Sequence, residues 1–347
     1  MFRRRRSRSF KIGALPIGGD APVSVQTMGN RDPHDAASCL EQLISCANQG
    51  CQLFRMTVPD LEAAAVFGEV RRQSPIPMVA DIHFDHRLAL AAIESGADAL
   101  RLNPGNIGGR DKVRAVALAA KAKGVPIRVG VNSGSLEPGE TLVSSALKHV
   151  KMLEDEGFFD IVISVKSSRV DETIAAYRDL AEKTDCPLHL GVTEAGTSLP
   201  GTVRSSVALG ILLSEGIGDT VRVSLTDRPE KEVKVALEIL RSLGLRESGP
   251  AIVSCPTCGR TRVDLFKVAA EVEAELERRH FADPAACLPK VAVMGCAVNG
   301  PGEAKGADIA LCGGDGEFLL FVGGKPVCKV SESDATRKVM EYVDSMG

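Results

Sequence analysis

The sequence predicts an α/β protein, a (β/α)8 barrel followed by a small α+β domain. Residues 22–243 repeat one pattern eight times: a short β-branched strand, a polar loop and a helix that mostly ends at glycine. The strands begin about every 28 residues, which fits a strand, a crossover helix and two short loops. After the polar stretch Arg246–Pro250 the pattern becomes irregular, which indicates a second domain.

The first part of the chain should form a parallel sheet, because its strands and helices alternate. Eight units in about 220 residues suit a closed barrel better than an open doubly wound sheet. The expected strands are Val23–Met28, Leu53–Val58, Met78–His83, Ala99–Asn103, Ile127–Asn132, Ile161–Lys166, Leu188–Glu194 and Val221–Thr226. The expected helices include Ala36–Gln49, Leu61–Gln73, Asp111–Lys123, Val143–Glu156, Val203–Glu215 and Pro229–Leu243.

The chain is expected to have three parts: a basic disordered tail over 1–10, a substrate-binding barrel over 11–246 and a smaller domain over 247–347. The smaller domain contains a glycine-rich segment, Gly295–Gly306. Its expected strands are Ala251–Ser254, Lys290–Met294, Asp308–Leu311 and Phe318–Val322, and its expected helices are Val263–Arg279 and Asp334–Met346.

Composition excludes several classes of protein. Of the 347 residues 44% are hydrophobic and 25% are charged, which is typical of a globular protein. No apolar run is long enough to span a membrane, and Met1–Phe10 lacks the apolar core of a secretory signal, so we expect a cytoplasmic protein. The net charge of −3 gives no reason to expect nucleic acid or a membrane as a partner. Ten cysteines in a reducing compartment favour metal binding or catalysis over disulfides.

Polar side chains close almost every expected barrel strand. The carboxyl ends of barrel strands form the mouth where chemistry takes place. Residues at positions i and i+2 of a strand share one face, so Asp81 and His83 should lie together. The other strand-end residues are Arg55, Arg101 with Asn103, Arg128 with Asn132, Lys166, Glu194, and Arg222 with Ser224.

Five of these residues are cations, although the chain is net acidic. Such a cluster repels itself unless an anion lies among the charges, and guanidinium groups match phosphate oxygens in pairs. The pattern therefore predicts a ligand with several phosphate charges. The alternative is that some of the cations pair with barrel carboxylates such as Asp81 and Glu194. Glu194 is the strongest acid–base candidate, and Asp81 and His83 are the others.

The cysteines of the second domain indicate a metal centre. Cys255 and Cys258 form a C-x2-C pair, which is compatible with zinc, a redox dithiol or an iron–sulfur cluster. Cys296 opens a glycine-rich loop that leads to Glu303, and such a loop lets backbone amides approach a cluster's sulfurs. Three thiolates and one carboxylate would leave one iron exchangeable. The alternative is a four-thiolate zinc site that uses Cys287.

Seven motifs follow one another along the chain: ADIHFD (80–85), RLNPGNIG (101–108), RVGVNSGSLE (128–137), LHLGVTEAG (188–196), LLSEGIGDTVRVSLT (212–226), CPTCGR (255–260) and GCAVNGPGEA (295–304). In this order they resemble the 4-hydroxy-3-methylbut-2-en-1-yl diphosphate synthases, the iron–sulfur enzymes of non-mevalonate isoprenoid biosynthesis. The resemblance runs from about Lys11 to the C-terminus and follows the bacterial two-domain form.

The resemblance implies a TIM barrel and reductive ring opening of 2-C-methyl-D-erythritol 2,4-cyclodiphosphate by two electrons, with loss of water. It implies a [4Fe-4S] cluster in residues 247–347, held by Cys255, Cys258, Cys296 and Glu303. The strand-end cations then correspond to the diphosphate site, Glu194 to the acid near the substrate carbons, and Asn299 to a residue that approaches the substrate. A flavodoxin or a ferredoxin would supply the electrons.

A homodimer is also expected. The eighth helix should return the chain to the far face of the barrel, roughly 22 Å from the mouth. The linker from Gly244 to Pro250 spans at most about 25 Å, which leaves little slack to carry a domain around the barrel. We therefore expect the second domain of one chain to cap the barrel of another.

Two other functions stay open at this point. One is a phosphate-binding barrel with a structural zinc module and no redox chemistry, which would give a colourless protein where a cluster protein is brown. The other is an RNA-binding module that uses the arginine run Arg3–Arg6, which would lose binding when Met1–Ser9 is removed.

Overall fold

The computed structural model describes residues 3–246, 249, 251–283, 286–298 and 300–346, without the side chains of Ser135, Phe281 and Glu303. The chain divides into two compact units, Met1–Arg246 and Glu247–Gly347. Each unit has a hydrophobic core of its own. No helix in the described part of the chain is long and apolar enough to cross a membrane.

The first unit is a (β/α)8 barrel, which confirms the predicted fold class. Among the described residues, eight parallel strands follow the order β8-β7-β6-β5-β4-β3-β10-β9. A parallel bridge between Ile163 and Leu188 joins β8 to the segment just before β9 and brings the two ends of this order together. The strands are β3 (Ser24–Met28), β4 (Leu53–Thr57), β5 (Met78–Asp81), β6 (Ala99–Leu102), β7 (Ile127–Asn132), β8 (Ile161–Lys166), β9 (His189–Leu190) and β10 (Thr220–Val221).

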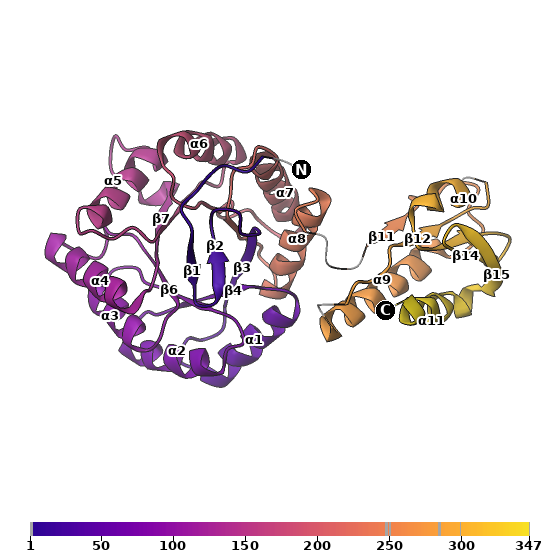
Figure 1. Ribbon diagram of the computed structural model, residues 1–347, viewed down its shortest axis with the longest axis horizontal. Coiled ribbons are helices and arrows are strands. Elements are labelled where there is room, and N and C mark those ends of the chain that lie inside the picture. The colour runs from indigo at the N-terminus through magenta and orange to yellow at the C-terminus, as the bar shows by residue number, and fades with distance from the viewer. Residues whose placement is uncertain (1–2, 247–248, 250, 284–285, 299, 347) are drawn as a thin grey trace. The chain divides into compact units, whose positions relative to one another are not determined.

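A ring of helices surrounds the strands (Figure 1). Aspartates open the first three helices, because the side chains of Asp35, Asp60 and Asp85 accept hydrogen bonds from first-turn amides. Gly124 ends α4 with φ +64°, a left-handed conformation that favours glycine. The helices are α1 (Ala36–Asn48), α2 (Leu61–Gln73), α3 (His86–Glu94), α4 (Arg110–Lys123), α5 (Leu142–Glu154), α6 (Val170–Lys183), α7 (Ser198–Ser214) and α8 (Pro229–Ser242), and the short 3-10 turn η1 (Ser133–Ser135) follows β7.

The last two barrel strands are shorter than the sequence predicts. β9 ends at Leu190, and Glu194 farther on has φ +50°, which turns the chain out of the extended conformation. β10 ends at Val221, and the Leu225 amide beyond it donates to Oε1 of Glu232 on α8 at 2.9 Å. The chain therefore leaves the ladder through a backbone turn after β9 and through a side-chain contact after β10.

The prediction of a disordered tail over residues 1–10 is wrong for its described part. Arg4 Nη2 lies 3.0 Å from Asp219 Oδ1, and Arg8 Nε lies 2.6 Å from Asp185 Oδ1. Arg5 donates to two backbone carbonyls near Asp185. These partners lie far along the chain from the arginines. The local sequence therefore gives no sign of them, and the arginine run resembles a solvated tail.

A two-stranded hairpin that the sequence analysis missed follows the arginine run. It pairs β1 (Phe10–Ile12) with β2 (Leu15–Ile17) in antiparallel fashion. Ile12 and Ile17 pack against residues near the start of β4, β5, β6 and β8, namely Leu53, Val79, Ala99 and Val162. The hairpin therefore covers the end of the barrel opposite the mouth.

The second unit contains one sheet in the order β11-β12-β13-β14-β15. The first three strands are parallel, and β14 and β15 continue the sheet in antiparallel fashion. The elements are β11 (Ile252–Ser254), α9 (Leu265–Ala282), β12 (Val291–Met294), α10 (Gly300–Glu303), η2 (Ala304–Gly306), β13 (Ile309–Gly313), β14 (Glu317–Val322), β15 (Lys325–Ser331), η3 (Glu332–Asp334) and α11 (Ala335–Met346). The sequence analysis missed β15.

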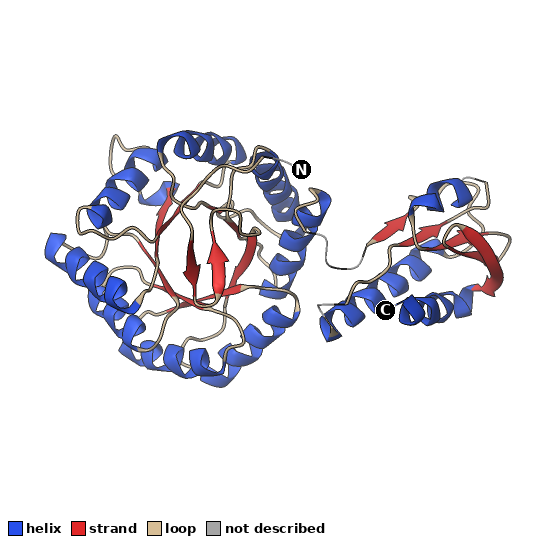
Figure 2. Cartoon of the chain, viewed as in Figure 1, coloured by secondary structure: helices blue, strands red, loops and turns tan. Residues whose placement is uncertain are grey.

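Both faces of this sheet are covered (Figure 2). On one face α9 and α11 pack through residues such as Leu276 and Val339. On the other face small residues, among them Ala292 and Ala310, contact Ala304 beside α10. The parallel strands β11 and β12 lead directly into Cys255 and Gly295, so the cysteine loops begin at neighbouring strand ends.

Candidate active site

The carboxyl ends of the barrel strands line a polar cavity of about 190 Å³. All five cations expected from the sequence lie on its wall. The lining residues are Met28, Arg55, Asp81, His83, Arg101, Arg128, Asn132, Ser164, Lys166, Thr193, Arg222 and Ser224. Their convergence follows from strand geometry, since alternate residues of each strand face the barrel interior.

Asp81 is the carboxylate on the cavity wall. Its oxygens lie 3.3 Å from Arg101 Nη1, 4.0 Å from Arg55 Nε and 3.7 Å from His83 Nε2. Burial would raise the pKa of Asp81, but the neighbouring cations, Arg55 first, outweigh burial and hold it below its usual value. Asp81 is therefore an anion that holds the arginines in place.

A second carboxylate, Glu232 on α8, was missed in the sequence because it lies on a helix outside the barrel. Its Oε1 lies 3.3 Å from Arg222 Nη2 and its Oε2 accepts from Thr27 Oγ1 at 2.7 Å. Glu232 is 4% exposed, so these protein contacts, and not water, compensate its negative charge. The pair fixes Arg222 at the edge of the cavity.

Arg128 forms the buried floor of the cavity. One of its terminal nitrogens donates to Gln26 Oε1, whereas Nε and Nη2 have no hydrogen-bond partner among the described residues. Burial, together with Arg55 and Arg101, lowers the pKa of Arg128 well below its ordinary value. A buried guanidinium with unused donors is suited to an anionic ligand.

Lys166 has no carboxylate partner in the described part of the barrel. Burial lowers the pKa of Lys166, and Arg222 and Arg55 lower it further. A Cβ on Gly191 would lie 2.7 Å from Lys166 Nζ, so the glycine leaves room for the ammonium group. In the same way Gly130 leaves room for Arg101, with 2.5 Å between a Cβ there and Arg101 Nε.

The charges around the cavity do not balance. Counted over the described residues, five cations meet the two carboxylates Asp81 and Glu232. The excess of positive charge predicts a ligand with more than one negative charge. The sulfur of Met28 lies 2.7 Å from Arg55 Nη2 and 3.8 Å from Arg222 Nη1, and a thioether does not neutralise either one.

A buried histidine lies in the barrel interior near these cations. His189 Nδ1 lies 2.6 Å from Thr220 Oγ1, and its Nε2 has no partner among the described side chains. Burial lowers the pKa of His189 well below its ordinary value, and Arg128 and Lys166 add to this effect. His189 is therefore neutral. In the sequence it stands inside a strand and looks like an ordinary core residue.

Two predicted barrel residues lie off this cavity wall. Asn103 follows the end of β6, and its Oδ1 accepts from the Gly105 amide at 3.0 Å, so it shapes the loop. Glu194, the strongest acid–base candidate in the sequence, is exposed within this chain. Its neighbour Thr193 does line the cavity.

A larger cavity of about 710 Å³ lies beside the mouth, between the loops that precede α2 and α3. It shares His83 with the polar cavity, and Phe84 on its wall is 74% exposed. It lacks the converging cations, so the smaller cavity is the stronger candidate for catalysis.

In the second unit, Cys255, Cys258 and Cys296 line one cavity of about 170 Å³. Thr257 has φ +67°, and its backbone amide donates to Cys255 Sγ at 3.4 Å. The backbone amide and side chain of Arg260 donate to Cys258 and lower its pKa. Amides directed at sulfur and a nearby cation are the surroundings that favour thiolate ligands.

The three thiols share this one cavity. Among the described residues, no three His, Cys, Asp or Glu side chains are already placed to hold one metal ion. Cys287 is exposed and does not line the thiol cavity. Asn299 and the side chain of Glu303 lie outside the described residues.

Lys166→Met is expected to raise the stability of the ligand-free protein and to weaken polyphosphate binding. Methionine keeps most of the volume and removes a buried charge that has no carboxylate partner. A charge-assisted phosphate contact contributes about 1.5–3 kcal/mol, so affinity for inorganic pyrophosphate should fall roughly ten- to a hundredfold. Thermal unfolding with and without pyrophosphate measures both effects. Lys123→Met, on the outer face of α4, is the control, and an unchanged affinity for Lys166→Met would remove Lys166 from the site.

Family models match both units of the chain. The model for the GcpE TIM-barrel domain matches residues 7–237, and the model for the GcpE protein C-terminal domain matches residues 251–345. The 4-hydroxy-3-methylbut-2-en-1-yl diphosphate synthase (flavodoxin) of Geobacter sulfurreducens is 52% identical over 98% of this chain and 98% of its own. The enzyme of the same name from Clostridium acetobutylicum is 51% identical over 99% of this chain and 100% of its own.

Solved structures resemble the barrel. Dihydropteroate synthase from Yersinia pestis has a TM-score of 0.51 at 12% identity and covers 68% of this chain and 97% of its own. Dihydropteroate synthase from Xanthomonas albilineans has a TM-score of 0.51 at 14% identity, over 69% of this chain and 98% of its own. At such identities the likeness shows the fold alone.

Proposed function

Because this chain belongs to the GcpE family, the 4-hydroxy-3-methylbut-2-en-1-yl diphosphate synthases, we propose how its two cavities carry out that reaction. The enzyme converts 2-C-methyl-D-erythritol 2,4-cyclodiphosphate to 4-hydroxy-3-methylbut-2-enyl diphosphate in non-mevalonate isoprenoid biosynthesis. Two electrons and two protons enter, a ring carbon–oxygen bond breaks and one hydroxyl leaves as water. The observation that carries the proposal is the excess of cations around the barrel cavity.

The barrel binds the diphosphate. Arg55, Arg101 and Arg222 are held by Asp81 and Glu232, so their guanidinium groups are already oriented before the ligand arrives. Arg128 and Lys166 supply charge that the protein leaves uncompensated. Asn132 and Ser224 add polar contacts at the same wall. Fixed charges of this kind also stabilise the negative charge that the diphosphate gains when the ring opens.

The other assigned residues handle protons and approach the carbons of the substrate. We assign Glu194 as the acid near the reacting carbons, with Asp81 and His83 as the other acid–base groups. Asn103 and Asn299 are assigned to substrate binding by family resemblance. His83 is half exposed at the mouth, 3.7 Å from Asp81 Oδ2, so both solvent and a ligand in the cavity can reach it.

The second unit holds the redox group. Cys255, Cys258, Cys296 and Glu303 are the ligands that we assign to a [4Fe-4S] cluster, which supplies two electrons one at a time and an iron with an exchangeable ligand. The clustering of the three thiols in one cavity supports this assignment. We assign flavodoxin as the electron donor, because the relatives carry it in their names, with ferredoxin as the alternative. A reducing cytoplasm would keep the ten cysteines free.

A homodimer is the proposed assembly, and the outer face of α7 supports it. Leu199, Val203 and Val207 lie four residues apart on that face and are 75%, 53% and 46% exposed. The single charge on α7, Arg204, donates from Nη1 to the Ala195 carbonyl at 2.8 Å. A helix with an apolar outer face is usually buried against another element. A second copy of this chain could bury it, because no like charges would meet at such an interface. The head-to-tail capping of one barrel by the other chain's second unit stays a prediction.

Val203→Glu is expected to weaken the dimer. A two-fold axis brings each substituted side chain into an apolar interface with its copy, so the dissociation constant should rise on the order of tenfold or more. Sedimentation velocity over a concentration series measures this. Leu118→Glu, an equally exposed site on α4, is the control. Unchanged sedimentation of Val203→Glu would show that α7 is not the interface.

The proposed function is tested by anaerobic reconstitution with iron and sulfide. A brown protein whose reduced form gives an electron paramagnetic resonance signal, altered by the cyclic diphosphate, supports the proposal. Formation of the product with reduced flavodoxin would then demonstrate the full reaction. A colourless protein that contains zinc and binds pyrophosphate would favour the phosphate-binding barrel with a zinc module instead.

A further inference from the structure

Two loops of the second unit meet at the thiol cavity. The first, Cys255–Asp264, carries two of the thiols, and the second begins at Gly295 and carries Cys296. Thr261 Oγ1 lies 2.8 Å from where a Cβ on Gly295 would be, and it also accepts from the Cys258 amide at 3.3 Å. The loops therefore form one continuous surface around the cavity, and Cys258 is exposed there.

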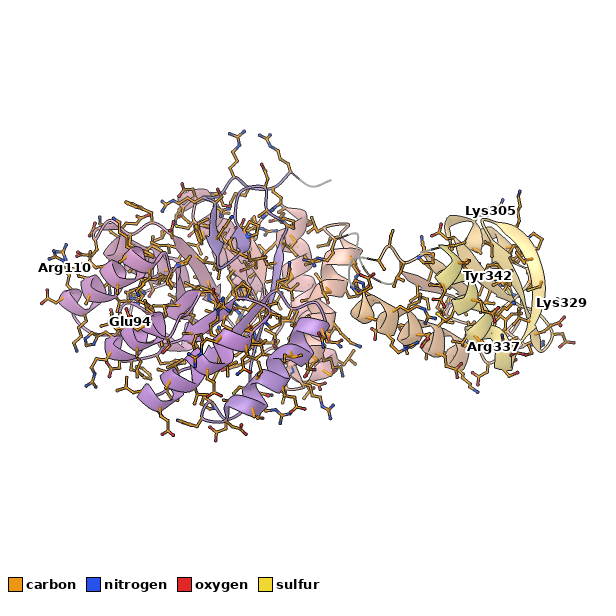
Figure 3. The ribbon with its side chains drawn as sticks, turned by 60° about the horizontal axis from the view of Figure 1, so that its bottom comes forward. Glu94, Arg110, Lys305, Lys329, Arg337 and Tyr342 are labelled. Atoms are coloured by element: carbon orange, nitrogen blue, oxygen red, sulfur yellow. The ribbon has the colours of Figure 1, made fainter. Side chains whose placement is uncertain are left out.

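Cations on this surface lack acidic partners. Arg260 lines the cavity, Arg262 donates only to the carbonyls of its own loop, and Lys267 lies in the first turn of α9. None of the three has a carboxylate within 4 Å among the described side chains. Most cations elsewhere on this unit are paired with acids. Two of these paired cations, Lys329 and Arg337, are labelled in Figure 3. The pairs are Arg278–Glu275, Arg279–Asp344, Lys329–Glu317, Arg337–Asp334 and Lys338–Glu341.

The start of α9 and the second loop carry the most exposed large apolar side chains of the unit's described part. Phe266 follows the first loop and is 75% exposed, and Val298 lies two residues after Cys296 and is 70% exposed. Apolar side chains between unpaired charges of one sign are typical of a surface that binds a partner of opposite charge. A small anion would use the cations but not the apolar groups.

We propose that Arg260, Arg262, Lys267, Phe266 and Val298 form the docking surface for an acidic electron-transfer protein of the flavodoxin type. The inference rests on the proposed function, which places a redox group at the thiols. Each docked partner gives up one electron and the cluster takes it, so two encounters supply the two electrons of a turnover. Arg260, whose side chain hydrogen-bonds to Cys258, lies directly beside the thiols.

The chemistry of the surface also predicts how it binds. Electron-transfer partners form small, short-lived contacts, below about 1,200 Å². Their association is accelerated by opposite charges and slowed by salt, because charges more than about 10 Å apart are largely screened at 0.1 M ionic strength. The apolar pair excludes water at the centre and keeps weak binding at higher salt.

The test uses the reconstituted holoenzyme with the charge reversals Arg262→Glu and Lys267→Glu. The matched control is Lys325→Glu, because Lys325 is exposed, has no ion pair in the described structure and lies on β15, at the opposite edge of the sheet from β11. Stopped-flow absorbance measures cluster reduction by reduced flavodoxin, and calorimetry measures the affinity for oxidised flavodoxin. Each reversal should slow reduction about tenfold at low ionic strength, and the salt dependence should become shallower.

Reduction by dithionite separates docking from damage to the cluster, because so small a reductant needs no docking surface. The proposal requires its rate to stay unchanged in all three variants. If Arg262→Glu and Lys267→Glu accept electrons from flavodoxin as fast as Lys325→Glu, the docking surface lies elsewhere. If the parent protein binds no cluster, the proposed function fails first, and that outcome is visible before any variant is made.

Discussion

Cys296→Ser is expected to abolish turnover by removing the iron–sulfur cluster. Cys296 lines the thiol cavity from the loop after β12, and the sequence from Gly295 to Gly306 holds no second cysteine that could replace it as a thiolate. A serine hydroxyl is less acidic than a thiol, and its oxygen is a harder ligand than a thiolate sulfur, so serine is a poor replacement at an iron–sulfur cluster. Iron counting and the visible spectrum after anaerobic reconstitution measure the loss.

Two other cysteines provide controls for this experiment. Cys287→Ser should keep the full iron content, because Cys287 is exposed and does not line the cavity. Cys312→Ala is a closer control, since Cys312 lies on β13 within the electrostatic reach of Cys296. Burial raises the pKa of Cys312 to about 11, so this group stays a thiol. Loss of iron in Cys287→Ser, with iron retained in Glu303→Ala, would overturn the ligand assignment in favour of a four-thiolate set that uses Cys287.

The barrel cavity was predictable because parallel strands align their carboxyl ends. The cations near the ends of the predicted strands, such as Arg55 and Lys166, therefore face one another across the mouth, whereas Glu194 does not line the cavity. The arrangement of the carboxylates was not predictable in the same way. Glu232 reaches Arg222 from a helix, and no strand periodicity points to it.

Long-range contacts explain the remaining differences between prediction and structure. The N-terminal arginines find Asp219 and Asp185 about 180 residues or more away, and a local charge run carries no sign of such partners. Gly130 and Gly191 look like ordinary strand glycines until the side chains that fill their space are known. Asn103 is an exception with a local cause: the strand ends one residue earlier, and the Asn103 side chain accepts from the Gly105 amide two residues on.

The backbone at Glu194 gives a further reason to assign it a catalytic role. Glutamate at φ +50° occupies a left-handed region that costs roughly 1 kcal/mol or more for a residue with a Cβ. No hydrogen bond or ion pair holds the Glu194 side chain among the described residues. A strained conformation without a stabilising side-chain contact, one residue beyond Thr193 on the cavity wall, is typical of functional residues.

Glu194→Gln is accordingly expected to lower turnover by a factor of about 10²–10⁴, with a much smaller change in affinity for the cyclic diphosphate. The substitution removes a proton donor or charge stabiliser but keeps the shape of the side chain. Glu194→Gly should lose the same activity yet unfold at an equal or higher temperature, since glycine relieves the strain at φ +50° and gains up to about 1 kcal/mol. Steady-state kinetics and thermal unfolding of both variants measure these effects. A glycine variant that melts several degrees lower would make Glu194 a structural residue, and equal losses of turnover and affinity in the glutamine variant would make it a binding residue.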